Sequence, residues 1–207
     1  MMIRTIIFDL GGVILTLDQS EAIRRFQQLG ISDADRRLDI YTQDGIFGQL
    51  EEGKITADTF QREAGLLAGH QLTFEECRWA WLGYAKELPQ RNLDLLLKLR
   101  SEGYRVVLLS NTNPFMMSWV RSPEFDGQGH SIDYYMDACY LSYEMGVMKP
   151  SQEFFHRVLM AEGISPSETL FLDDGARNVA AASQMGIRTF CPENGADWTK
   201  EIYDYLK

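Results

Sequence analysis

The sequence contains few cysteines and few prolines, and it has no long apolar run. Among its 207 residues are three cysteines and six prolines. Cys77, Cys139 and Cys191 are odd in number and far apart, and no C-x-x-C pair exists, which argues against a disulfide framework or a zinc knuckle. No stretch reaches the roughly 18 apolar residues of a membrane span, and the N-terminal apolar run meets Asp9 too early for a secretory signal. We therefore expect a protein of the reducing cytoplasm that does not enter a membrane.

Basic residues are also scarce. The chain has 20 Lys and Arg against 30 Asp and Glu, a formal net charge of −10, and no long basic run. A protein that binds by neutralising phosphate backbones has the opposite balance, and an anionic membrane surface would repel this one. These observations exclude nucleic acid and membranes as expected partners. A hydrophobic content of 45% is sufficient for a buried core, and the length suits one domain with an insertion. Nothing in the sequence indicates the oligomeric state.

Short apolar runs alternate with helical stretches that end at glycine. The four runs are nearly continuous, as is typical of strands buried on both faces; they are residues 5–8, 105–109, 169–172 and 187–190. The helical stretches are residues 92–100, 151–161 and 176–185, which are followed by Gly103, Gly163 and Gly186. This order predicts an α/β fold, a Rossmann-like doubly wound parallel sheet that binds ligands at the carboxyl ends of its strands.

One segment breaks the alternation. Residues 16–89 contain only helical signals, including two sequences typical of capping boxes, which begin at Asp18 and Thr73. A segment of this length is too long to be a connecting loop. We therefore predict an α/β core formed by residues 1–15 and 90–207, and a small helical cap formed by residues 16–89, inserted after the first strand and lying over the strand ends.

Polar residues follow the first two strand runs. Asp9 comes directly after the first run and precedes Gly11 and Gly12, which allow a ligand to approach the backbone closely. The second run ends in residues 110–113, Ser-Asn-Thr-Asn, before a proline that suits the first turn of a helix. Hydroxyl and amide donors at a helix start favour an anion. Taken alone, each pattern also fits an ordinary turn or helix cap.

Two further elements bring charge to the same edge of the sheet. Lys149 stands just before Pro-Ser at the start of a helical stretch, where it can place an ammonium beside an anion, although a lone lysine is more often solvated. Asp173 and Asp174 follow the third apolar run. Adjacent acids at the end of a buried strand are costly unless a cation neutralises them, and Mg²⁺ prefers such oxygen ligands.

The order Asp, Ser-Asn, Lys, Asp-Asp, each at a strand end or helix start, resembles the haloacid dehalogenase superfamily. The similarity covers the first strand and nearly everything from residue 89 to residue 190, with the helical insert in the position of that family's cap. Residues 8–13, 52–56, 109–113 and 171–174 are similar to the phosphatase branch that includes the bacterial α-D-glucose-1-phosphate phosphatases and the N-terminal domain of soluble epoxide hydrolases.

The resemblance implies a role for each of these residues. Asp9 would be the nucleophile, while Ser110 and Lys149 would act with it by binding the phosphoryl oxygens. Further contacts with the substrate would come from Gly11, Gly12, Asn111, Thr112 and Asn113. Mg²⁺ would be held by Asp9, the Gly11 carbonyl, Asp174 and, through water, Asp173. Asn178 would orient Lys149 or one of the acids. The implied activity is Mg²⁺-dependent hydrolysis of a small phosphate ester, such as a sugar phosphate, through an aspartyl-phosphate.

One position departs from the family pattern. Phosphatases of this superfamily carry a second aspartate two residues after the nucleophile as general acid and base, but here that residue is Gly11. A sugar 1-phosphate, whose leaving oxygen needs little protonation, would tolerate this loss best. Two alternatives remain open: a dehalogenase in which Asp9 attacks carbon, and a phosphometabolite-binding protein without catalysis.

Other patterns receive structural interpretations. Residues 48–54 nearly spell a P-loop, but Ile55 occupies the required Ser or Thr position, so a turn between helices is expected. The pair Glu51-Glu52 is interpreted as a solvated helix face. The three histidines have no metal-binding spacing: His70, His130 and His156. The aromatic residues of the insert are expected to pack the cap: Trp79, Trp81 and Tyr84.

Overall fold

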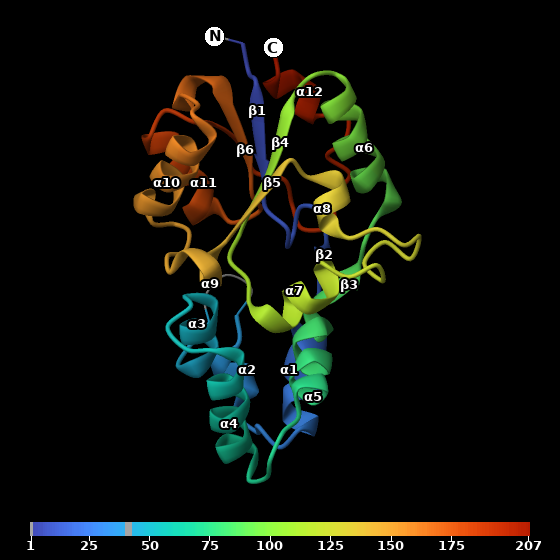
Figure 1. Ribbon diagram of the computed structural model, residues 1–207, viewed down its shortest axis with the longest axis vertical. Helices are drawn as coiled ribbons and strands as arrows, with labels where there is room; N and C mark the ends of the chain where they lie inside the picture. Colours follow the sequence, from blue (N-terminus) through green and yellow to red (C-terminus); the bar gives the residue numbers. More distant parts are fainter. Residues whose placement is uncertain (1, 40–42) are drawn as a thin grey trace.

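The computed structural model describes residues 2–39 and 43–207. Its centre is a five-stranded sheet in the order β5-β4-β1-β6-β7, and every neighbouring pair is parallel (Figure 1). The strands are β1 (Thr5–Phe8), β4 (Arg105–Ser110), β5 (Ala138–Leu141), β6 (Thr169–Leu172) and β7 (Arg188–Phe190). The predicted α/β, doubly wound fold is confirmed.

Helices cover both faces of this sheet, because side chains alternate along each buried strand. Ile6 and Phe8 of β1 pack into one layer, whereas Ile7 packs into the other. The first layer includes α6 (Gln90–Ser101), α8 (Ile132–Tyr135) and α12 (Ile202–Tyr205). The second includes α10 (Gln152–Glu162) and α11 (Ala176–Gln184). The remaining short elements of the core are α7 (Pro114–Val120), α9 (Ser142–Met145) and η2 (Pro166–Glu168).

Within the parallel sheet, the strand that the sequence did not reveal is β5, at one edge. Its first three residues are only partly buried, and they include the polarisable Cys139 and the amphipathic Tyr140. The apolar-run pattern identified β1, β4, β6 and β7, the strand at the other edge, but the partly buried residues of β5 were not recognised as such a run.

The cap has its own aromatic core. It consists of α1 (Gln19–Gln28), α2 (Ala34–Arg37), α3 (Ile46–Glu51), α4 (Ala57–Ala68), α5 (Phe74–Trp81) and η1 (Leu82–Tyr84). Phe47 lies at its centre, with ring centroids 5.1 Å from Phe26, 5.1 Å from Phe60 and 5.7 Å from Trp81. The aromatic residues therefore pack the cap as expected, except Trp79, which is exposed and lies under the guanidinium of Arg25.

The two predicted capping boxes differ in outcome. At the start of α5, Thr73 and Glu76 form the complete reciprocal pair. At the start of α1, the Asp18 carboxylate accepts from the amides of Ser20 and Glu21, but the Glu21 side chain pairs with arginines of its own helix instead. At Asp18, therefore, the bonds to the capping carboxylate form but the reciprocal bond from Glu21 does not.

Helix α7 joins the two parts of the molecule. It follows β4 of the sheet, yet Phe115 and Met116 are buried in the aromatic core of the cap. The Phe115 ring lies 4.8 Å from that of Phe74 and 5.5 Å from that of Phe60. The hydrophobic core of the cap is thus completed by a helix from the sheet domain.

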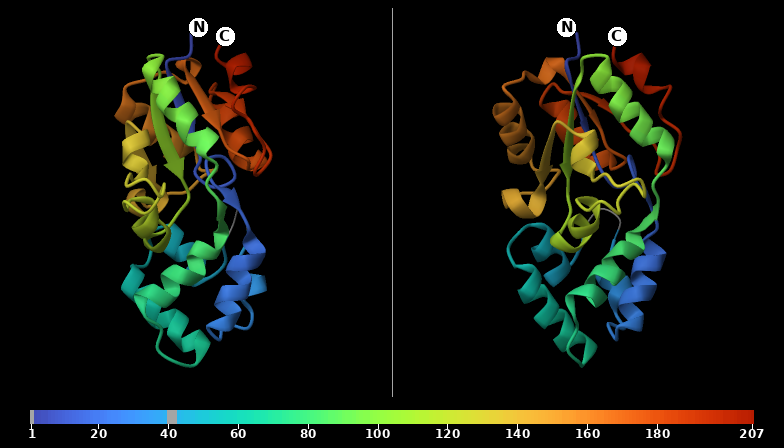
Figure 2. Two further views of the ribbon diagram at one scale, coloured as in Figure 1. Left: turned by 90° about the vertical axis from the view of Figure 1, so that its right-hand side faces the viewer. Right: turned by 45° about the vertical axis from the view of Figure 1, so that its right-hand side comes forward.

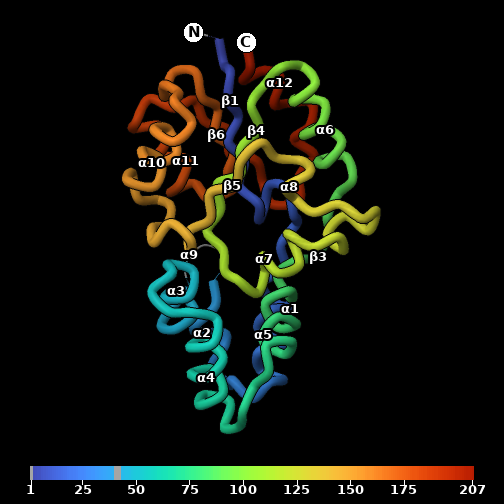
Figure 3. The backbone as a smooth tube through the Cα atoms, in the orientation of Figure 1, coloured from blue at the N-terminus to red at the C-terminus, as the bar shows by residue number. Residues whose placement is uncertain are grey.

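The chain passes between core and cap along a short antiparallel ribbon, β2 (Thr16–Leu17) with β3 (Ala85–Glu87) (Figure 3). This ribbon lies at both ends of a segment for which the sequence indicated only helices. The predicted domain limits fall beside it and stay a prediction, and residues 40–42 of the predicted cap lie outside the described residues. The cap sits at the end of the core opposite the two termini (Figure 2). Among the described residues, no helix has the length and apolarity needed to cross a bilayer.

We expect Phe47→Ala to destabilise the protein by about 3–5 kcal/mol, because it removes the ring at the centre of the cap. Denaturant unfolding measures this loss. Leu66→Ala, at an exposed position of α4, should change the free energy of unfolding by less than about 0.5 kcal/mol. Equal effects of the two substitutions would contradict the packing described above.

Candidate active site

Three acids meet at the carboxyl end of the sheet. Strands β1 and β6 pair with Phe8 beside Leu172, so the next residues, Asp9 and Asp173, are neighbours across the strand ends. A carboxylate oxygen of each, together with one of Asp174, lies within 4.8 Å of the others. The sheet register therefore brings together residues that are more than 160 positions apart in the sequence.

A buried lysine bridges two of these acids. The Nζ atom of Lys149 lies 2.9 Å from Oδ1 of Asp9 and 2.7 Å from Oδ2 of Asp173. Asn111 holds the lysine backbone by two hydrogen bonds of 2.9 Å, accepting from its amide and donating to its carbonyl. Burial alone would lower the pKa of Lys149, but the carboxylates of Asp173 and Asp9 outweigh it and the pKa is raised. The lysine therefore stays charged at neutral pH.

The hydrogen bonds of Asp173 fix the orientation of its carboxylate. Its Oδ1 accepts from the amide of Gly175 at 2.8 Å, and Nδ2 of Asn178 donates to both carboxylate oxygens, at 3.0 and 3.1 Å. Asn178 thus orients an acid, one of the two roles that the resemblance implies. Asp173 in turn fixes Lys149. Contact of Asp173 with a metal through water stays a prediction.

The electrostatics of Asp9 favour a cation. Burial raises the pKa of Asp9 well above its usual range; the ammonium of Lys149 opposes this shift, and the nearby Asp173 and Asp174 add to it. The three carboxylates present oxygen atoms close together, beside the ammonium of Lys149. A divalent ion with oxygen ligands, such as Mg²⁺, fits this donor set.

Gly12 permits the approach of Asp174. The backbone of Gly12 has a φ of +75°, and a Cβ built on it would lie only 2.1 Å from the carboxyl carbon of Asp174. At Gly11, a Cβ would meet Cδ1 of Leu17 at 2.9 Å. The space beside Gly11 is therefore filled by an apolar side chain from the ribbon between core and cap.

The residues of the 110–113 loop make different hydrogen bonds. Ser110 is buried, and its hydroxyl donates to the Asn111 carbonyl at 3.3 Å. The amide of Thr112 donates to Ser142 Oγ at 3.0 Å. Asn113 caps α7, because its Oδ1 accepts from two amides of the first turn, both at 3.1 Å. Its Nδ2 is buried and has no hydrogen-bond partner within the described part of the chain.

Glu51, the last residue of α3, does not lie on a solvated helix face, so that interpretation is wrong. Its side chain points into a pocket between cap and core, where burial raises the pKa of Glu51 to about 7 and the Asn113 side chain opposes the shift. The neighbouring Glu52 pairs with Lys54 at the surface. Two adjacent glutamates with polar neighbours carry no signal that tells which one is buried.

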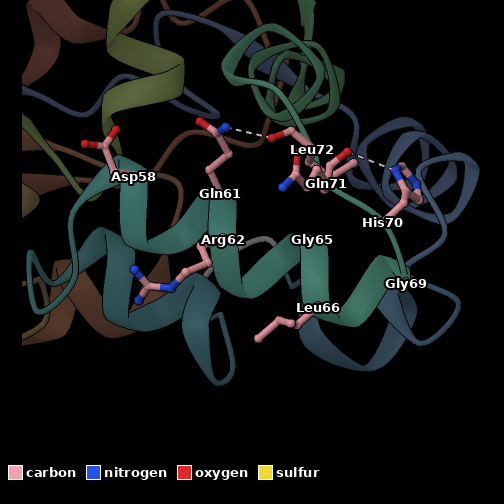
Figure 4. Close-up of a pocket in the computed structure, with 9 residues that line it drawn as sticks. All are labelled: Asp58, Gln61, Arg62, Gly65, Leu66, Gly69, His70, Gln71 and Leu72. Carbon is pink, nitrogen blue, oxygen red and sulfur yellow. Dashed lines mark hydrogen bonds between the residues drawn. The ribbon is translucent and has the colours of Figure 1, made fainter.

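The pocket beside the acid cluster is small, at about 70 Å³. It is lined by the residues that follow Asp9, by the 110–113 loop and by the cap, and its lining includes Leu10, Gly11, Leu17, Gln43, Glu51, Trp81, Tyr84 and Met116. A larger cavity of about 700 Å³ runs along α4 and the loop after it, within the cap (Figure 4). There, Gln61 donates to the Leu72 carbonyl and the His70 ring contacts backbone carbonyls, so these polar groups hold the cap loop.

Comparison with known proteins agrees with this geometry. The sequence matches the haloacid dehalogenase-like hydrolase family over residues 3–186. It is 50% identical over 201 residues to a D-ribitol-5-phosphate phosphatase of Bacteroides thetaiotaomicron, which covers 97% of both chains. The chain belongs to the haloacid dehalogenase-like hydrolases.

Two solved structures are similar to this chain over nearly its whole length. A hydrolase of Porphyromonas gingivalis superimposes with a TM-score of 0.95 and 39% identity, covering 100% of this chain and 99% of that one. A family enzyme of B. thetaiotaomicron, solved with magnesium and inorganic phosphate, has a TM-score of 0.86 and 37% identity, covering 96% and 98%. The hydrolase described here thus shares its whole architecture with enzymes of this family.

Gly12→Ala should weaken Mg²⁺ affinity by about ten-fold or more, because the added methyl group displaces the Asp174 carboxylate. Isothermal titration with Mg²⁺ measures the change. Gly103→Ala is the matched control: Gly103 also has a positive φ, of +93°, but a Cβ there has nothing within 4 Å. If both variants bound Mg²⁺ like the wild type, Asp174 would not be a ligand.

The raised pKa of Glu51 predicts a pH-dependent stability. Since its pKa rises from 4.5 in an exposed chain to about 7 in the folded protein, the unfolded chain releases the proton first as pH increases. The free energy of unfolding should therefore fall between pH 4.5 and 7, by about 3 kcal/mol relative to Glu51→Gln. Urea denaturation across this range measures the difference. Glu52→Gln should follow the wild-type profile, and a flat difference for Glu51→Gln would contradict the burial.

Proposed function

We propose that this hydrolase is a Mg²⁺-dependent phosphatase for a small sugar or polyol phosphate. The observation that carries the proposal is the bridge of Lys149 between Asp9 and Asp173, with Asp174 in the same cluster. The high identity to a D-ribitol-5-phosphate phosphatase over nearly the whole chain supports it. The family resemblance, which the order of these residues carries, implied the same class of reaction.

The reaction divides into two transfers. Asp9 attacks phosphorus in line with the ester oxygen, and the phosphoryl group passes to its carboxylate while the alcohol leaves. Water then attacks the aspartyl-phosphate and releases inorganic phosphate. When bound by Asp9, Asp174 and the Gly11 carbonyl, Mg²⁺ supplies positive charge that favours the approach of two anions.

The remaining residues orient the reacting groups and neutralise the charge of the phosphoryl oxygens. Lys149 donates hydrogen bonds to Asp9 and to a phosphoryl oxygen, and Asp173 keeps it in place. Ser110 and the backbone of residues 111–113, with Gly11 and Gly12, would contact the phosphoryl group. Asn111 contributes by fixing the backbone of Lys149, since its side chain is already hydrogen-bonded there.

We further propose that the phosphate is carried on a primary alcohol. The Bacteroides relative is named for ribitol 5-phosphate, whose leaving group is a primary alkoxide, whereas the reasoning from Gly11 favoured the more acidic oxygen of a sugar 1-phosphate. The pocket of about 70 Å³ suits the part of a small substrate next to the phosphate. The free thiols of Cys77, Cys139 and Cys191 support action in the reducing cytoplasm.

The two alternatives predict different results. A dehalogenase attacks carbon in a carboxylate substrate, which the acid cluster would repel when no Mg²⁺ is bound. A protein that only binds phosphometabolites has no need of a nucleophile, but here Asp9 lies 2.9 Å from an ammonium and close to two further acids.

A screen of phosphate esters with Mg²⁺ tests the proposal. Polyol 5-phosphates, sugar 6-phosphates and sugar 1-phosphates should be compared by phosphate release, with 2-haloacids compared by halide release. We expect turnover of a polyol phosphate that a chelator abolishes, and a loss of at least about 10³-fold in Asp9→Asn. Wild-type turnover by Asp9→Asn, halide release in chelator, or binding of phosphate esters without hydrolysis would each contradict it.

A further inference from the structure

The proposed function leaves one requirement unmet. A primary alkoxide is a poor leaving group unless it receives a proton, and general acid catalysis typically contributes about 10²–10⁴-fold. Gly11 offers no acid, and Leu17 fills the space beside it. Another group that lines the pocket must supply the proton if the substrate is a polyol phosphate.

The described lining of the pocket contains one carboxylic acid, Glu51. The other titratable lining side chain, Tyr84, donates its hydroxyl hydrogen to the Asp39 carbonyl at 3.0 Å, and burial raises its pKa far above neutral. Lys149 is bound by two carboxylates, with a raised pKa. Neither Tyr84 nor Lys149 can readily release a proton at neutral pH.

The contact between cap and core places Glu51 at the pocket. Two residues beyond it, Gly53 lies so close to the core that a Cβ there would be 2.2 Å from the Tyr143 carbonyl oxygen. The end of α3 therefore rests directly on α9, and Glu51 shares the pocket wall with Gly11 and residues 110–113. This contact fixes the acid on the side of the pocket opposite the sheet.

Asn113 adds a polar group to the same part of the pocket. Its side chain is fully buried, its Oδ1 caps α7, and its Nδ2 has no hydrogen-bond partner among the described residues. It faces Glu51, and its hydrogen-bonding side chain opposes the rise in the pKa of Glu51. The amide and the acid therefore form one polar patch on the pocket wall, which a polar group of the substrate can complete.

We propose that Glu51 of the cap is the general acid and base of this phosphatase. In the first step, Asp9 forms a bond to phosphorus, the ester P–O bond breaks, and the Glu51 carboxyl gives its proton to the leaving oxygen. In the second step, the Glu51 carboxylate takes a proton from water as the water oxygen bonds to phosphorus and the bond to Asp9 breaks. Both groups return to their starting states.

The ionisation of Glu51 agrees with this role. A pKa of about 7 gives a mixture of protonated and ionised carboxyl near neutral pH, which suits a group that donates and then accepts a proton. The acid comes from the cap and the nucleophile from the sheet. The catalytic set is therefore complete only when the cap is seated on the core.

Kinetics with substituted phenyl phosphates of increasing phenol pKa test this role. These substrates have no hydroxyls to recognise, and kcat/KM reports the transfer to Asp9. Protonation matters more for poorer leaving groups, so Glu51→Gln should show a steeper fall of kcat/KM with phenol pKa than the wild type. On a polyol phosphate we expect a loss of about 10²–10⁴-fold. Glu52→Gln, the adjacent surface acid, should keep the wild-type slope and rate.

An unchanged slope in Glu51→Gln would overturn the assignment. A loss confined to polyol phosphates with that unchanged slope would identify Glu51 as a hydroxyl-binding residue instead. Failure of the proposed function itself is distinct, because the wild type would then release no phosphate from either class of ester. Mg²⁺ titration and circular dichroism of Glu51→Gln exclude misfolding as the cause of a loss, since no metal contact is assigned to Glu51.

Discussion

The buried ammonium of Lys149 is the interaction on which the site depends. Without it, Asp9 and Asp173 would place negative charges side by side in a region that little water reaches. With it, Asp9 is held at the end of β1, and the carboxylate of Asp174 lies within the same cluster. The cluster is stable enough to form in the folded chain and remains incomplete until a cation and an anionic substrate arrive.

The parallel sheet makes this arrangement possible. Because all five strands run in the same direction, their carboxyl ends meet at one edge, and residues from β1, β4 and β6 converge there. The residues that follow the strands differ in chemistry: an aspartate after β1, hydrogen-bonding side chains after β4 and a pair of acids after β6. Asn111 links the second group to Lys149, so the parts of the site are mechanically connected rather than merely adjacent.

The sequence predicted the parts of the molecule whose signals are local. Continuous apolar runs identified β1, β4, β6 and β7, and the acids after β1 and β6 lie together with Lys149 at one edge, as the sequence predicted. The edge strand β5 was missed because partial burial requires no such run. Glu51 was misinterpreted for a different reason. Its environment is created by residues of η1 and the 110–113 loop, far away in the sequence, and the pair Glu51-Glu52 looks like any exposed helix end.

The packing of Phe115 and Met116 within the cap has an evolutionary consequence. Helix α7 begins at Pro114, directly after the 110–113 loop, and its apolar residues are divided: Phe115 and Met116 pack in the cap, whereas Met117 and Val120 pack in the sheet core. If related enzymes exchanged caps without α7, Phe115 and Met116 would lose the cap residues that cover them. The transferred cap would in turn lack the side chains that complete its aromatic core. New substrate preferences in this lineage are thus expected to arise by substitutions at the cap's pocket-facing positions, with the inserted segment and α7 inherited together.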